Sequence, residues 1–304
     1  MAGGFTHTTG FAPELLYPGI KAIWGQAYKQ VPKLYEKFMA IESSSKRFEK
    51  EQGMTGFSLA GVKDEGDSVS FGRLTQGFQK EYVHTTYGLG ATITREMVED
   101  DQYNFISQIP RLLAEAMQRT EEVLAHGVLN NAFDTAVTGA DASALCVTSH
   151  ANAGSAGGTQ SNRPTTAADL TQASLEAALI DIDNFRDENA QRIIINPKKI
   201  CVSRSDRFNL TKILETKFKV GSADNDVNVI ANLALEPVVS NYLTDQDAWF
   251  VTTDALNGLK FIWRRRPDLN RDNDADTQNL SIITTSRFDT GWTDWRGVWG
   301  SPGA

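Results

Sequence analysis

The chain has 304 residues, of which 40% are hydrophobic and 22% are charged, and its formal net charge is −8 at pH 7. These values are ordinary for a folded protein of one large or two medium domains, and the acidic balance argues against a protein whose main task is to grip nucleic acid. The two cysteines, Cys146 and Cys201, are far apart and form no C-x-x-C pair, so we expect no disulfide framework and a reducing cytosol.

The first 50 residues are expected to form an arm with one or two short helices. The chain start lacks the basic and apolar pattern of a secretory signal, so we expect synthesis in the cytoplasm. Residues 13–41 carry apolar and aromatic side chains in a helical rhythm. Pro18 and Pro32 are expected to interrupt it, because proline lacks the N–H that the helix ladder needs. The charged stretch SSSKRFEKEQG (43–53) then ends the arm.

Residues 54–94 have β character. The stretches SVSFGRL (68–74) and FQKEYVHTTYGLGATIT (78–94) are rich in Val, Thr, Tyr and Phe, and Gly72 and Gly77 offer turn positions. Neither stretch alternates cleanly between apolar and polar, so we expect a hairpin that projects and finds its partner elsewhere. An ordinary two-stranded flap is the alternative.

The strongest periodic segment runs from 105 to 128, after the acidic residues Glu99, Asp100 and Asp101. Spacings of three and four predict an apolar stripe along a helix of about seven turns, made of Phe105, Ile109, Leu112, Leu113, Ala116, Thr120, Val123, Leu124, Gly127 and Val128. Pro110 is expected in the first turn or at a kink. The polar face is expected to be solvated or part of an interface and holds Arg111, Glu115, Arg119 and Glu122.

A Gly-rich loop, SHANAGSAGGTQSNRP (149–164), follows a strand expected at 144–149. A phosphate cradle has little support, because no Lys follows the glycines and they do not space as G-x-G-x-x-G. A helix is expected at 168–186, capped by Thr166 or Asp169, with a buried stripe of Leu175, Ala178, Leu179, Ile182 and Phe185.

The last third of the chain mixes strands with one helix. A helix is expected at 205–218 with Ser205 as its cap. Strands are expected at 192–196, 198–203, 227–240, 248–253 and 259–265, and one long strand is expected within the Trp-rich ending 279–304. We find no internal repeat, and a mixed α+β architecture follows.

Two cysteines and one histidine were tested as a reactive or metal-binding set. Cys146 and His150 lie four residues apart, which says little about a catalytic pair across a fold. With Cys201 they would still leave a structural zinc site one ligand short.

Three further motifs fail. Asp272, Asp274 and Asp276 match the first positions of a calcium loop, but Thr277 and Ile283 stand where its Gly and Glu belong. Ser43 and Lys46 satisfy S-x-x-K without the motifs that accompany it. The basic run 264–266 is interpreted as a set of salt-bridge donors. We therefore expect no enzyme, cofactor or metal, and keep a cytosolic hydrolase using Cys146 or a loop serine with His150 as a remote alternative.

Four segments in a fixed order carry a family resemblance: ITREMVEDDQY (93–103), the loop and helix start at 148–179, INPKKICVS (195–203) and FDTGWTDWRGVWGSPGA (288–304). In this order they resemble the major capsid proteins of tailed bacteriophages, most closely the Mu-like major head subunit family.

The resemblance implies the α+β fold of tailed-phage and herpesvirus major capsid proteins. Its regions would be an N-terminal arm (1–50), an extended hairpin (51–95), a peripheral domain with a long spine helix (96–138 and 278–304) and an axial domain (139–277). The implied function is self-assembly, as hexamers and pentamers, into an icosahedral shell that encloses double-stranded DNA without sequence-specific binding. Portal, scaffolding and decoration proteins are possible partners; the implied location is the virion, assembled in the cytoplasm of the host bacterium. A cellular shell of the same fold that encloses protein cargo is the main alternative.

In such shells the hairpin lies over a neighbouring subunit. We therefore expect contacts between subunits at Phe71, Arg73, Phe78, Lys80, Tyr82, Arg264, Arg265, Trp292 and Trp295. Lys63 and Lys80 lie in the hairpin, but neither matches the Lys–Asn cross-link motif of some relatives. A removable N-terminal segment has no room unless the chain is already processed.

Overall fold

The computed structural model describes residues 13–57, 59–69, 71–72, 74–94, 96–97, 100, 105–154, 157–216, 227–273 and 279–304. The chain forms two compact units, each made of three separate segments. The first unit takes Met1–Lys33, His84–Val123 and Trp263–Phe288, and the second takes Leu34–Val83, Leu124–Ile262 and Asp289–Ala304. These boundaries differ from those of the four regions that the resemblance implies, and the four-region division stays a prediction.

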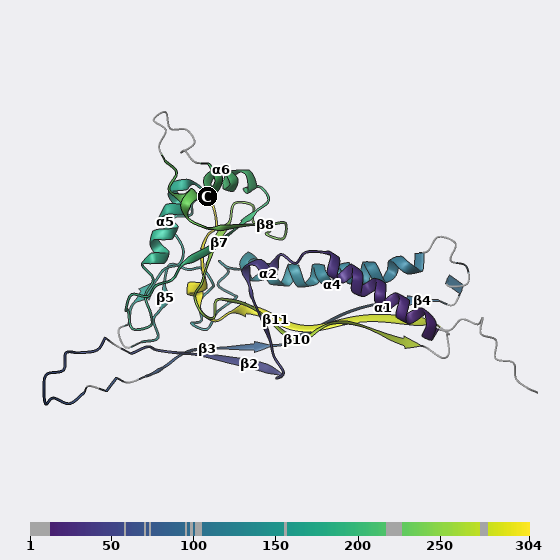
Figure 1. The fold of residues 1–304 in the computed structure, drawn as a ribbon, viewed down its shortest axis with the longest axis horizontal. Coiled ribbons are helices and arrows are strands. Elements are labelled where there is room, and N and C mark those ends of the chain that lie inside the picture. Colours follow the sequence, from purple (N-terminus) through teal and green to yellow (C-terminus); the bar gives the residue numbers. More distant parts are fainter. Residues whose placement is uncertain are drawn as a thin grey trace, which may run out of the picture. The chain divides into compact units, whose positions relative to one another are not determined.

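The first unit is built from two helices over a sheet. Its elements are α1 (Pro13–Gln30), β4 (Thr85–Ile93) and most of α4 (Phe105–Asn130), β10 (Leu259–Asn273) and β11 (Leu280–Trp292). Within this unit the sheet has the order β10-β11-β4, and β1 (Ala40–Ser43) belongs to the second unit. In Figure 1, α1 and α4 lie on one side of β10 and β11. Their shared core is made of Ile20, Trp24, Ala27, Ile93, Ile106, Leu113, Ala114, Leu269, Leu280 and Ile282.

The helix α1 corrects one detail of the sequence prediction. Pro18 lies inside the helix and does not interrupt it, whereas Pro32 follows its end. A proline near a helix start removes few backbone bonds, and burial of Ile20 and Trp24 holds the turns that follow. The short α2 (Tyr35–Phe38) comes next.

The predicted long helix is confirmed as α4, but its buried face is different. Leu112 and Val123, placed on the apolar stripe, are exposed, whereas Glu122, placed on the polar face, is buried. Glu121 is buried too, and it accepts a hydrogen bond from the Tyr28 hydroxyl at 2.6 Å. Buried polar groups are tolerated when they are paired. Which face of α4 is buried therefore depends on partners distant in the sequence and not on the apolar spacing alone.

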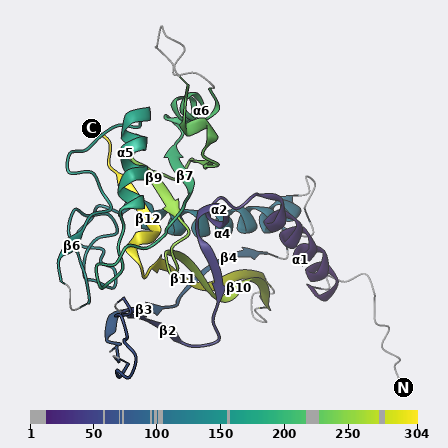
Figure 2. The ribbon, with the colours of Figure 1, turned by 60° about the vertical axis from the view of Figure 1, so that its left-hand side comes forward.

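The second unit contains a four-stranded sheet with the order β12-β9-β7-β8. The strand β7 pairs with β8 in parallel and with β9 antiparallel, and β9 pairs antiparallel with β12. Helix α5 stands beside β9 and β12 in Figure 2, and its predicted buried stripe is confirmed. The bounds are α5 (Gln172–Asp183), α6 (Arg207–Glu215), η1 (Ile230–Asn232), β7 (Pro197–Ser203), β8 (Glu236–Ser240), β9 (Trp249–Thr253), η2 (Trp295–Gly297) and β12 (Val298–Ser301).

Several local predictions in this unit are wrong. Residues 144–149 form no strand, because their backbone groups bond elsewhere: the Cys146 N–H donates to the Ala132 carbonyl at 2.8 Å. Residues 192–196 make only one isolated bridge, and 227–240 are extended only at the end. The Gly-rich loop instead pairs β5 (His150–Ala151) with β6 (Thr159–Gln160).

The helix caps in this unit also differ. Thr171 caps α5 in a reciprocal arrangement with Ser174, in place of Thr166 or Asp169. Asp206, not Ser205, stands at the start of α6, without a side-chain cap bond.

The hairpin exists, but one of its strands was misplaced. Strand β3 (Gln76–Val83) pairs with β2 (Phe48–Met54), a segment that the sequence presented as a charged linker. Its charges are matched across the pair, since Lys50 lies 3.2 Å from Glu81. The described residues within 68–74 form no strand. Figure 1 shows the long loop that closes the hairpin beyond the two strands.

Candidate functional site

The hairpin tip exposes an unusual amount of apolar surface. Its large apolar side chains from the last residue of β2 to the residue before Thr75 are all exposed, with Phe71 at 96% and Val62 at 97%: Met54, Phe57, Leu59, Val62, Val69, Phe71 and Leu74. Single exposed apolar residues are common, but a contiguous set marks an interaction site.

The same tip is acidic. Asp64, Glu65 and Asp67 are exposed, with Lys63 as the neighbouring cation, and Gly66 turns the chain with φ of +89°. A left-handed turn of this kind favours glycine. The tip therefore combines apolar and negative surface in one extended loop.

The root of the hairpin is fastened by polar side chains. Glu51 of β2 accepts a hydrogen bond from the Thr293 hydroxyl at 2.6 Å, and Thr293 lies 2.7 Å from the hydroxyl of Tyr82 on β3. Lys260 of β10, with its side chain 5% exposed, forms ion pairs with Glu51 at 2.5 Å and Glu42 at 3.0 Å. The hairpin is therefore held at its base by buried side-chain contacts, and the carbonyl of Gly56, just beyond β2, accepts a further hydrogen bond from the Asn189 amide.

Lys80 adds a second fastening on β3. Its ammonium donates to the Thr138 carbonyl at 2.6 Å and lies 5.6 Å from the centre of the Trp292 ring. Burial lowers the pKa of Lys80, although the charge of Asp289 opposes that shift. Lys80 is thus engaged within its own chain.

The described residues among those predicted to touch other subunits fall into three groups by burial. Tyr82, Trp292 and Trp295 are buried inside the second unit, so their side chains offer little surface to a neighbour. Phe78 and Lys80 are half-buried. Phe71, Arg264 and Arg265 are exposed, and Arg73 lies outside the described residues.

The arginine run has partners other than carboxylates in the described part of the chain. Arg265 donates to the Thr285 hydroxyl at 3.0 Å, and the Arg266 guanidinium lies 5.8 Å from the Trp263 ring centre. The interpretation of these arginines as salt-bridge donors therefore does not hold among these residues.

The Cys146 and His150 pair has no geometry for nucleophilic catalysis. His150 is fully buried, its Nδ1 lies 2.6 Å from Asp141 and its Nε2 lies 3.0 Å from Asn162. The imidazole also stacks on Trp295 at 4.4 Å. Burial raises the pKa of the Cys146 thiol far above its usual range, which leaves it protonated and inert. The group is a structural junction.

The Asn162 amide fixes how that junction is protonated. Its nitrogen faces the carbonyls of Leu145 and Val298, at 2.7 and 2.8 Å, so it must donate to both. Its oxygen then accepts from the Val147 N–H at 3.0 Å and from a proton on His150 Nε2. The junction thereby ties the Gly-rich loop to the C-terminal segment.

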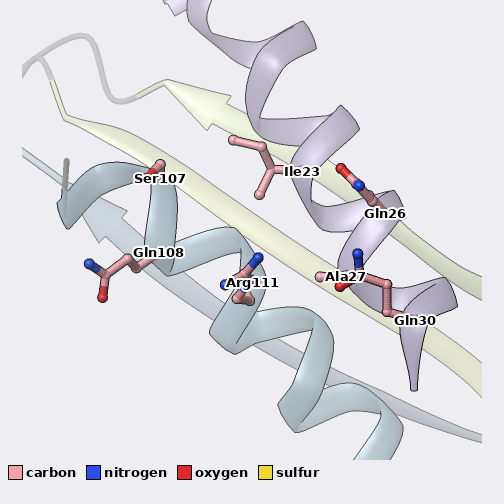
Figure 3. A pocket seen from close by; sticks show the side chains of 7 residues that line it. All are labelled: Ile23, Gln26, Ala27, Gln30, Ser107, Gln108 and Arg111. Carbon is pink, nitrogen blue, oxygen red and sulfur yellow. The ribbon is translucent and has the colours of Figure 1, made fainter. Parts of the chain in front are cut away.

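Two of the hollows among the described residues are considered as small-ligand sites. One, of about 240 Å³ in the first unit, has α1 on one side and α4 on the other (Figure 3), and is lined by Ile23, Gln26, Ala27, Gln30, Ser107, Gln108 and Arg111. The other, of about 480 Å³, is lined by the Gly-rich loop and the end of α5. It includes Arg163 and Arg186 but also the Asp181 carboxyl, so it is not a simple anion cradle.

The described residues offer neither a metal-binding cluster nor a membrane-spanning helix. No group of three His, Cys, Asp or Glu side chains there could hold a metal ion. No described helix combines the length and apolar character that crossing a bilayer requires. Asp274 and Asp276 of the rejected calcium motif lie outside the described residues.

The root residues Glu51, Thr293 and Lys260 were missed by sequence reasoning. Glu51 sits in a charged run, and the other two lie over 200 positions away, so no spacing joins them. The one weak signal is the pair of opposite charges Glu51 and Lys80. These two residues face each other only when residues 48–54 are recognised as strand β2.

Comparisons with known proteins agree with one another. A family model described as "Phage capsid protein" matches residues 78–301 of the chain. The search of curated proteins finds no match.

Solved structures extend the likeness to almost the whole chain. The capsid of cyanophage P-SCSP1u is similar with a TM-score of 0.60 at 11% identity, over 88% of this chain and 86% of that one. A structure from Microbacterium phage Oxtober96 gives 0.55 at 11%, over 99% and 95%. A virus-like particle from Pyrococcus furiosus gives 0.54 at 9%, over 94% and 99%. At such identities the likeness concerns the fold.

Proposed function

Since this chain belongs to the phage capsid protein family and has its α+β fold, we propose that it is the major capsid subunit of a tailed bacteriophage. Copies of the chain assemble through hexamers and pentamers into an icosahedral shell that encloses double-stranded DNA. The Mu-like subset of the family is the best fit to the four segments that carry the sequence resemblance.

The observation that carries this proposal is the hairpin tip. Side chains such as Val62 and Phe71 are almost fully exposed to water in the single chain. Burial of apolar surface stabilises by about 25 cal/mol per Å², so a second copy that covers the tip gains from each of them. Many weak contacts of this kind acting together suffice to hold a closed shell.

Subunit contacts are proposed at the exposed members of the predicted set. Phe71 supplies apolar surface, and Arg264 and Arg265 supply positive charge that complements the acidic tip of a second copy. Such complementarity fixes register and steers encounter more than it adds affinity, and it weakens with salt.

The role of this subunit is structural. The buried junction of Cys146 and His150 offers no reactive group, in line with a protein that is not an enzyme. The location that follows is the virion, with assembly in the host bacterial cytoplasm; portal, scaffolding and decoration proteins are further partners.

The test is negative-stain electron microscopy of the purified protein with its light-scattering mass, followed by nuclease treatment. Uniform shells, or tubes and rings of five- and six-fold units, that protect double-stranded DNA are the expected result. Particles assembled with and without a co-expressed scaffold are compared. A monomer or dimer under both conditions contradicts the proposal.

A cellular shell that encloses protein is the second candidate. Its support is the likeness to the virus-like particle from Pyrococcus furiosus, which covers nearly the whole of both chains. The contents of particles purified from the native source separate the two: nuclease-protected DNA favours the capsid, and a single co-purifying protein without DNA favours the cargo shell.

A further inference from the structure

The hairpin root contains ionised groups in an unusually buried place. The Lys260 side chain is 5% exposed and that of Glu51 is 19% exposed, yet they form a direct ion pair. Burying charges costs more than an apolar pair of the same shape, so such pairs are weak evidence for stability and better explained by the geometry they impose. Asn257 completes the set, accepting from Lys260 at 2.9 Å.

The hydrogen bonds of the root run in one direction. An ionised carboxylate only accepts, so the Thr293 hydroxyl donates to Glu51. That hydroxyl has a single proton, so its oxygen must accept from the Tyr82 hydroxyl. This series of hydrogen bonds, from Tyr82 through Thr293 to Glu51, joins both hairpin strands to the C-terminal segment that contains Thr293.

These bonds act on one face of the hairpin only. Lys80 and Tyr82 are two residues apart on β3 and share a face, and Glu51 lies opposite Lys80 in the pairing register. The opposite face carries the ion pair of Lys50 and Glu81, whose side chains are 49% and 44% exposed. A two-stranded hairpin that is bound along one face is held at one angle to the segment that binds it.

The C-terminal segment is shaped to receive this face. A Cβ at Gly291 would lie 3.0 Å from Tyr82 Cε1, a tight contact that would push the Tyr82 ring back by a few tenths of an ångström, so glycine favours this close approach. The Tyr82 side chain is buried there at 1% exposure.

We propose that Glu51, Thr293 and Lys260 form a positioning cluster that fixes the direction of the β2–β3 hairpin within the second unit. The inference rests on the proposed function, because the hairpin direction matters only if the tip must meet another subunit. The cluster acts in the unassembled chain, so it is tested without any shell.

The test measures the freedom of the hairpin by electron spin resonance on the full-length, unassembled protein. Spin labels are attached at Glu65→Cys in the tip and Asp245→Cys, both exposed, while native Cys146 and Cys201 are buried. Glu51→Gln removes the charge of the cluster, and Glu81→Gln is the same change on the solvent face of the hairpin. Glu51→Gln should widen the distance distribution about twofold or more, with Glu81→Gln unchanged. Equal widths for both variants would overturn the inference.

A second pair of variants guards against misfolding. Thr293→Val removes the bridging hydroxyl at nearly constant volume, and Thr293→Ser keeps it. The distribution should widen for Val and return to the parent width for Ser, whereas a purely packing role predicts the reverse order. A distance distribution that stays narrow in Thr293→Val would overturn the inference and would not affect the proposed function. A widened distribution in a protein that never forms shells keeps the inference and ends the proposed function.

Discussion

The C-terminal segment and the hairpin tip are both rich in large apolar side chains, but only one of them is covered. Trp292, Trp295 and Trp299 are between 2% and 4% exposed, whereas Phe71 is 96% exposed. The tryptophans find partners inside the second unit, such as Trp249, whose ring centre is 5.0 Å from that of Trp299. Composition alone therefore does not separate surface meant for the chain's own core from surface left for a second copy.

The largest difference between the two regions should appear on truncating an aromatic side chain. Trp299→Ala removes a core ring and should lower the free energy of unfolding by about 3–5 kcal/mol. Phe71→Ala in the tip should change it by less than about 0.5 kcal/mol. Chemical denaturation of the unassembled protein measures both, and similar losses would contradict the contrast.

The stability that the buried junction around Asp141 and His150 contributes to the fold should depend on pH. Burial raises the pKa of Asp141, but the hydrogen bond and charge of His150 lower it more, so it lies below its ordinary value of 3.8. Ionised Asp141 therefore stabilises the fold above that value, and the contribution fades as the pH falls through the folded-state pKa.

Asp141→Asn tests this sign. The substitution should cost about 1–3 kcal/mol at neutral pH, and its difference from the parent should shrink as the pH falls below the ordinary carboxyl pKa of 3.8. Asp64→Asn in the exposed tip is the matched control. A cost for Asp141→Asn that stays constant from neutral to acid pH would rule out this role.

A smaller effect is expected from adding one methyl group. Gly291→Ala places a Cβ 3.0 Å from Tyr82 and should cost about 1–3 kcal/mol through overpacking. Gly61→Ala in the tip meets nothing within 4 Å and should stay within about 0.5 kcal/mol of the parent. Thermal unfolding of the two variants measures both changes in stability. If Gly291→Ala is as stable as the parent, the Tyr82 ring has room to move and the prediction is wrong.

The smallest effect on stability should accompany the largest effect on assembly. The double variant Phe57→Ser and Phe71→Ser should change the free energy of unfolding by less than about 0.5 kcal/mol. It should nevertheless abolish closed shells in electron micrographs, because the lost apolar surface is needed only between copies. Normal shells would remove the tip from the assembly interface.

Periodic segments of the fold could be predicted from the sequence, and segments whose partners are distant could not. The α+β class, the long helix α4 and the buried stripe of α5 follow local spacing and are confirmed. The buried face of α4 was wrong for Glu122, which is buried, and for Val123, which is exposed; the neighbouring Glu121 is buried too and is paired with Tyr28, some 90 positions earlier. Strand β2 was missed because its charges are matched only across the hairpin.

The site divides in the same way. A hairpin in this part of the chain could be predicted, although β2 was not recognised as one of its strands; that the hairpin finds a partner in a second copy stays a prediction. The root could not, because Glu51, Lys260 and Thr293 are ordinary residues that only the fold brings together. The burial of Trp292 and Trp295 likewise depends on packing that no spacing reveals.

The division of each unit into three separate chain segments has a consequence for biosynthesis. The first unit needs Trp263–Phe288 and the second needs Asp289–Ala304, so neither is complete while these residues are still inside the ribosome. Contacts between distant segments form slowly, and Thr293 at the hairpin root is translated 242 positions after Glu51, to which it donates a hydrogen bond. A nascent chain therefore lacks the hydrogen bond between Thr293 and Glu51 at the hairpin root until residue 293 has left the ribosome.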